Sequence, residues 1–149
     1  MGADVADWRP GAHVIGAGIG RGAFAEYMLL PAAGVVLVPP GWADEQALGM
    51  VVSWPTVLAA LKPLGQIKSG QTTLIHAAAG GTGQAAIAMA KHYGVRVIAV
   101  ASAQKHEVVR SLGADHVLDS RDLELAAEVL RLTDGAGVDR SHRRRSLRC

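Results

Sequence analysis

Residues 73–84 have the sequence TLIHAAAGGTGQ, in which an apolar run leads directly into a cluster of glycines. The run Thr73–Ala77 predicts a buried β-strand, and the segment Thr82–Tyr93 predicts the helix that follows it. A second apolar run, Val95–Ala101, predicts another strand after that helix. A strand, a glycine-rich turn, a helix and a second strand within about thirty residues indicate a dinucleotide-binding unit.

The glycines have separate roles in such a turn. In the pattern G-x-G-x-x-G, the key positions fall on Ala78, Gly80 and Gly83. Ala78 departs mildly from the glycine expected at the tight turn. Gly80 has no Cβ, so a pyrophosphate can approach its backbone, and Gly83 lets the helix lie close to the strand. The amides of Gly81 and Thr82 open the helix, where its dipole favours an anion.

Strands and helices continue to alternate further along the chain. We expect a helix at 104–112, a strand at 116–118 and a helix at 122–132. This order predicts a parallel sheet with right-handed crossovers. The fold class is therefore α/β, with half of a Rossmann doubly wound parallel sheet.

The end of the second strand chooses between the two nicotinamide cofactors. NAD enzymes carry an acid there that accepts hydrogen bonds from the adenosine ribose, but this chain has no acid between Ala101 and Glu107. Ser102 and Lys105 stand in that segment and suit a 2′-phosphate, so we expect NADPH. The alternative is that Ser102 only caps a helix and that Lys105 is only a solvated residue of its first turn.

The first forty residues differ from the rest in character. Short apolar runs at 14–15, 23–30 and 35–38 predict strands joined by loops, and Pro39-Pro40-Gly41 ends the last of them. We therefore expect a separate, β-rich region before the α/β part.

Composition excludes several classes of protein. Half of the residues are hydrophobic and 19% are charged, which is typical of a globular domain. Five arginines lie between Arg140 and Cys149, and without an aromatic partner they are weak evidence for nucleic-acid binding, which we do not expect.

Cys149 is the only cysteine, so we expect a reducing, cytoplasmic location. Basic residues interrupt every apolar stretch of about 20 residues, so we expect no membrane span.

Several motifs in order resemble the zinc-independent quinone oxidoreductases of the medium-chain dehydrogenase/reductase superfamily. The matching segments are Gly22–Tyr27, Ile75–Ala86, Leu112–Val117 and Thr133–Asp139. The resemblance implies NADPH-dependent reduction of quinones or activated enones, without a metal. It implies that Thr56 lies near the nicotinamide, although Thr56 is equally a residue of a helix N-terminus. It also implies a possible homodimer, and it identifies no catalytic side chain.

Zinc ligands are not expected from the residues themselves. The six histidines show no metal-ligand spacing, and no cysteine precedes Cys149.

Two departures from the family define the expected domains. Residues 1–42 resemble a remnant of a GroES-like substrate domain, and residues 43–139 resemble the dinucleotide-binding half. After Asp139 an arginine-rich sequence replaces the expected apolar strand, so we expect residues 140–149 to be a disordered basic tail and the neighbouring strand edge to be open. We therefore expect a fragment cut at both ends and a poor catalyst. The alternative to an enzyme is a truncated product that at most binds nucleotide or a partner subunit.

Overall fold

The computed structural model describes residue 5, residues 8–18 and residues 24–142, and the chain divides into two compact units, residues 1–52 and 53–149. The first unit contains an antiparallel pair in which Val14 lies opposite Leu37. Its elements are β1 (Val14–Gly16), the short 3₁₀ helix η1 (Ala32–Gly34), β2 (Val35–Leu37) and α1 (Asp44–Gly49). Residues 24–30 contain no strand, so the strand expected there is wrong for its described part, in which Phe24, Tyr27 and Leu29 are exposed.

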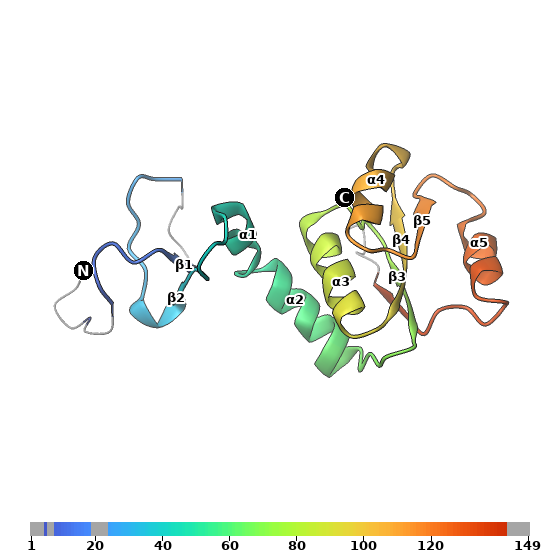
Figure 1. Ribbon diagram of the computed structural model, residues 1–149, viewed down its shortest axis with the longest axis horizontal. Coiled ribbons are helices and arrows are strands. Elements are labelled where there is room, and N and C mark those ends of the chain that lie inside the picture. The colour runs from blue at the N-terminus through green and yellow to red at the C-terminus, as the bar shows by residue number, and fades with distance from the viewer. Residues whose placement is uncertain (1–4, 6–7, 19–23, 143–149) are drawn as a thin grey trace, which may run out of the picture. The chain divides into compact units, whose positions relative to one another are not determined.

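The second unit alternates strands and helices, as the sequence predicts (Figure 1). Its elements are α2 (Ser53–Ala59), η2 (Ala60–Leu64), β3 (Thr72–Ile75), α3 (Gly81–His92), β4 (Arg96–Ala101), η3 (Ala103–Lys105), α4 (His106–Ser111), β5 (His116–Asp119), α5 (Leu125–Leu132) and β6 (Arg140–His142). The strand order is β5-β4-β3-β6 and every pair is parallel. The predicted α/β class with half of a Rossmann sheet is confirmed.

Side chains of β4 alternate between two apolar cores, one on each face of the sheet. Val97 and Ala99 belong to the core that also contains Ile87 of α3, whereas Ile98 and Val100 belong to the core that contains Val129 of α5. The helices α3 and α5 accordingly lie on opposite sides of the strands (Figure 1). Burial on both faces explains why β4 is an almost unbroken apolar run.

Two predicted helices begin later or are divided. The helix expected at 104–112 consists of η3 followed by α4, and the helix expected at 122–132 begins at Leu125. The carboxylates of Asp119 and Asp122 accept hydrogen bonds from the amides of Arg121 and Glu124, respectively. Such local bonds stabilise turns in competition with the helix.

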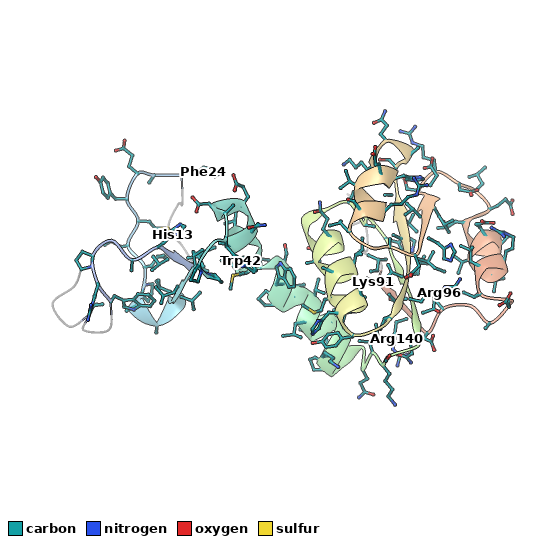
Figure 2. All side chains as sticks on the ribbon, in the orientation of Figure 1. His13, Phe24, Trp42, Lys91, Arg96 and Arg140 are labelled. Carbon is teal, nitrogen blue, oxygen red and sulfur yellow. The ribbon has the colours of Figure 1, made fainter. Side chains whose placement is uncertain are left out.

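Residues 140–142 correct the expectation of an open edge beside β3. They form β6, in which Ser141 lies beside Leu74. Asp139 donates its amide to the Thr72 carbonyl and accepts the Thr72 amide on its carboxylate, and Arg140, labelled in Figure 2, donates from Nε to the Gly65 carbonyl at 2.7 Å. The expectation of a disordered tail is therefore wrong for residues 140–142. Strand pairing uses backbone groups, so it does not require the apolar side chains that the sequence lacks here. Residues 143–149 lie outside the described part.

The division into units falls after Val52, whereas the expected domain boundary fell after Trp42. Around this division, the 21-residue segment Asp44–Leu64 is long and apolar enough to cross a membrane, with a mean hydropathy of 1.4 in its most apolar part. Core helices of soluble proteins meet the same criteria, and a turn at Met50–Val52 interrupts this segment. One such segment is weak evidence, and the expected absence of a membrane span stays a prediction.

Candidate functional site

The chain turns sharply between β3 and α3. Residues 76–80 form the turn, and the amide of Ala78 donates to the carbonyl of Val100 on β4 at 3.0 Å. The amide of Gly80 donates to the carbonyl of Ala77 at 2.9 Å. These bonds hold the turn against the carboxyl end of the neighbouring parallel strand, which is where open α/β sheets bind ligands.

Gly83 is required by packing within the protein. A Cβ at this position would lie 2.5 Å from the carbonyl oxygen of Ala77 and 2.7 Å from the Cα of Ala78. Real Cβ atoms do not approach backbone so closely, so only glycine lets the first turn of α3 rest on the residues after β3. This is the close packing that the glycine pattern predicts.

Gly80 has a different reason to be glycine. Its φ of −80° and ψ of 162° are accessible to any residue, so its conformation does not require glycine. A Cβ there would contact only the carbonyl of Ala77, at 3.3 Å, and Gly80 lines a cavity of the second unit, described below. Its bare backbone therefore leaves room on the cavity side, as close approach of a pyrophosphate requires.

The start of α3 suits an anion. Gly80 caps the helix without a side chain, and the first turn contains no acidic residue. Helix geometry leaves the amides of Gly81, Thr82 and Gly83 without carbonyl partners inside the helix. The helix dipole adds partial positive charge at the same place. The hydroxyl of Ser53, on α2, is close to this helix start, because it lies 3.5 Å from the position that a Cβ on Gly81 would occupy.

A cavity of about 690 Å³ opens beside this turn. The last two residues of β4 line it, together with segments that follow β3, β4 and β5 and one residue each of η3 and α5. The lining residues are His76, Ala77, Ala79, Gly80, Val100, Ala101, Ser102, Lys105, Ser120 and Leu125. This set contains no carboxylate, and Lys105 is its only permanently charged member. The cavity therefore suits an anionic ligand.

Ser102 and Lys105 stand where β4 gives way to η3. Ser102 is at the N-cap position of η3, but its hydroxyl makes no capping hydrogen bond. Lys105 is exposed at the end of η3, and in the described part of the chain no carboxylate pairs with it. Both polar groups can therefore turn toward a ligand in the cavity that they line.

Three of the eight residues expected to bind the cofactor line the cavity, namely Gly80, Ser102 and Lys105. Ala78 is fully buried beneath the turn, and Gly81, Thr82 and Gly83 form the first turn of α3. Thr56 is exposed on α2 and is not among the lining residues. The cofactor roles of all eight stay predictions.

Sequence reasoning missed three residues that line the cavity. His76 follows β3, and Ser120 and Leu125 come from the segment that begins at the end of β5. The polar end of β5 was available as a signal, because carboxyl ends of neighbouring parallel strands meet at one edge of a sheet.

Metal ligands do not gather in the part of the chain that the structure describes. No three histidine, cysteine, aspartate or glutamate side chains there lie close enough to hold an ion. These residues do not fit a zinc site, and we assign no step to a metal.

Comparison with known protein families identifies the second unit. Residues 81–142 match the family described as zinc-binding dehydrogenase. The chain is 39% identical over 141 residues to erythronolide synthase EryA2 of Saccharopolyspora erythraea, a match that covers 93% of this chain and 4% of that protein.

Solved structures resemble the chain over most of its length. The CurF ER cyclopropanase from the curacin A biosynthetic pathway has a TM-score of 0.87 and 36% identity, covering 96% of this chain and 42% of that one. A quinone oxidoreductase of Pseudomonas syringae pv. tomato DC3000 has a TM-score of 0.76 and 33% identity, covering 88% and 41%. Mycobacterial Rv1454c, solved in complex with NADPH, has a TM-score of 0.66 and 38% identity, covering 73% and 34%.

The chain spans less than half the length of each of these proteins. Their names include an erythronolide synthase and a cyclopropanase as well as a quinone oxidoreductase, so the quinone oxidoreductase subfamily is not singled out. What the solved structures share with this chain is the fold. The second unit thus has the fold of the Rossmann-like half of a medium-chain dehydrogenase/reductase domain, and the solved structures that it resembles include oxidoreductases.

Proposed function

We propose that this protein is an NADPH-dependent reductase of carbon–carbon double bonds that are activated by a carbonyl group, such as those of enoyl thioesters and enones. Quinones are the second candidate substrate. The observation that carries the proposal is a cavity beside the glycine turn whose lining has a lysine and no carboxylate.

The preference for NADPH rests on charge. An acid at the end of β4 would repel a 2′-phosphate, whereas Ser102 and Lys105 line the cavity there and can donate to it. Hydrogen bonds to charged groups contribute about 1.5–3 kcal/mol, which corresponds to roughly ten- to a hundredfold in affinity.

The proposed division of labour leaves the redox chemistry to the cofactor. When bound, NADPH supplies a hydride, and a proton completes the reduction of the substrate. The amides at the start of α3 hold the pyrophosphate, and Gly80 leaves space for it. Lys105 neutralises negative charge, and the protein's main contribution is to position the two reactants.

The choice of enoyl compounds over quinones rests on the names of similar proteins. Enoyl reductases appear among the matching structures, for example JamJ enoyl reductase, which has a TM-score of 0.84 and 36% identity. The quinone oxidoreductase match is somewhat weaker in both coverage and TM-score. The alternative to an enzyme is a protein that binds the nucleotide but catalyses no reaction.

Absorbance of NADPH at 340 nm, followed with purified protein, tests the proposal. The substrates are a crotonyl thioester, a simple enone and a benzoquinone, and the control is Gly80→Val, whose side chain would fill the approach to the turn. We expect oxidation with the thioester or the enone, at a rate at least tenfold lower in the variant. Turnover with the quinone alone would support the second candidate, and binding without any turnover would contradict the enzymatic proposal.

A further inference from the structure

The cavity contains one ionisable side chain that the proposed function leaves without a role. His76 directly follows β3, is half-buried and lines the cavity together with Ser102 and Lys105. Histidine changes charge close to neutral pH, so its position beside an anion-binding cavity has consequences for binding.

The register of the sheet places His76 beside the β4 wall. Ile75 lies beside Ala99, so the next residue, His76, comes level with Val100. Leu74 and Val100 belong to the same apolar core, on the α5 face of the sheet. Because side chains alternate along a strand, these two residues mark the face on which the strands end. His76 and Ser102 each follow one of these strands directly, and both line the cavity.

Lys105 is the permanently charged residue that lines the cavity together with His76. On η3 and α4, Lys105 lines the cavity, while His106 Nε2 lies 3.1 Å from the Ala101 carbonyl. On β5 the Asp119 carboxylate accepts the Arg121 amide, and in the segment before α5 the Asp122 carboxylate accepts the Glu124 amide. None of these four side chains lines the cavity. On the other side of β3, β6 contributes Arg140, which donates to the carbonyls of Gly65 and Asp139, and the backbone of His142.

We propose that His76 is a phosphate-binding residue of the cofactor site and that the nucleotide binds more tightly when its imidazole is protonated. This inference rests on the proposed function. A protonated imidazole has two donors and a positive charge, whereas the neutral form has one donor and no charge. The bound phosphate therefore favours protonation, and binding and proton uptake are linked. The 2′-phosphate and the pyrophosphate offer the same chemistry, and the experiment distinguishes them.

The test is calorimetric titration with NADP⁺ and NAD⁺ at pH 6.5, 7.5 and 8.5. These values lie above the second pKa of a phosphate monoester, about 6. We expect wild-type affinity for NADP⁺ to be about five- to tenfold higher at pH 6.5 than at pH 8.5. In His76→Gln this dependence should largely disappear. A dependence for NADP⁺ alone assigns the 2′-phosphate, and one for both nucleotides assigns the pyrophosphate.

His92→Gln is the matched control, because it removes the same ionisable group from the far end of α3, where the side chain is exposed. It should keep the wild-type pH dependence. Titration of the wild type at pH 7.5 in two buffers of different ionisation enthalpy gives the proton uptake directly, without any variant. Equal pH dependence in wild type and His76→Gln, or no proton uptake, would overturn the inference. Failure of the wild type to bind either nucleotide at any pH would contradict the proposed function itself.

Discussion

The ammonium group of Lys91, labelled in Figure 2, lies 2.8 Å from each carboxylate oxygen of Asp115. The same carboxylate accepts the amide of Val97 through Oδ2 at 2.7 Å. One side chain thus joins α3, β4 and the segment that precedes β5. The cluster lies at the amino ends of β4 and β5, whereas the cavity lies at the carboxyl ends, so it bears on stability and not on ligand binding.

The first prediction concerns the pH dependence of this cluster. Partial burial raises the pKa of Asp115, but hydrogen bonds from Lys91 and Val97 and the charges of Lys91 and His116 together lower it below its ordinary value. A lowered pKa in the folded state means that the stabilisation is present above the unfolded pKa, about 3.9, and is lost as pH falls through the folded value.

Asp115→Asn should therefore lower the free energy of unfolding at pH 7 by roughly 0.5–1 kcal/mol, since the pair is partly exposed. At pH values below the folded pKa, the variant and the wild type should converge. Urea denaturation at pH 7 and at a strongly acidic pH measures both differences. A deficit of the same size at both pH values would show that the charge of Asp115 contributes nothing.

The second prediction concerns Gly83. Alanine is the better helix former by about 1 kcal/mol, but a Cβ there would lie 2.5 Å from the Ala77 carbonyl oxygen. We expect Gly83→Ala to lower the free energy of unfolding by about 1–3 kcal/mol. Gly81→Ala is the control, because its Cβ would meet only Ser53 Oγ, at 3.5 Å. The account fails here if thermal melts show equal effects of the two substitutions.

The third prediction concerns backbone strain in the turn. Ala77 has a φ of 51°, in the left-handed region that costs a non-glycine residue about 1–2 kcal/mol. Glycine relieves this cost but loses more entropy on folding, so Ala77→Gly should raise the free energy of unfolding by about 0.5 kcal/mol. Ala79→Gly, at a residue without positive φ in the same turn, should lower it. A loss of stability in both variants would contradict the reported conformation.

Apolar runs and glycines made much of the second unit predictable. Because β3, β4 and β5 are short and bounded by turns, each was expected within two residues of its observed ends. The edge strand β6 could not be expected from Arg140 or Ser141, because its pairing is carried by backbone atoms. The start of α5 was displaced because the amides of Arg121 and Glu124 donate to the Asp119 and Asp122 carboxylates, and these bonds compete with the helix.

The candidate site was predictable where it is local in sequence. The glycine turn and the Ser102–Lys105 segment each occupy a few consecutive residues. Ser120 and Leu125 lie further along the chain, and they join the cavity because β4 and β5 are parallel neighbours whose carboxyl ends meet at one edge of the sheet. Thr56 was expected from resemblance alone, and it is absent from the lining residues.

The central claim is that this cavity binds NADPH in preference to NADH through Ser102 and Lys105. The most direct measurement is the ratio of the dissociation constants of the two nucleotides, obtained by fluorescence titration of the wild type, Lys105→Glu and the control Lys68→Glu. Lys68 precedes β3 and so lies at the end of that strand away from the cavity. Its substitution by glutamate changes the charge by the same amount as Lys105→Glu. We predict that the wild type and the control bind NADPH about ten- to a hundredfold more tightly than NADH, and that Lys105→Glu abolishes or reverses the preference. A wild-type ratio near one, or a ratio that Lys105→Glu leaves unchanged, would contradict the account.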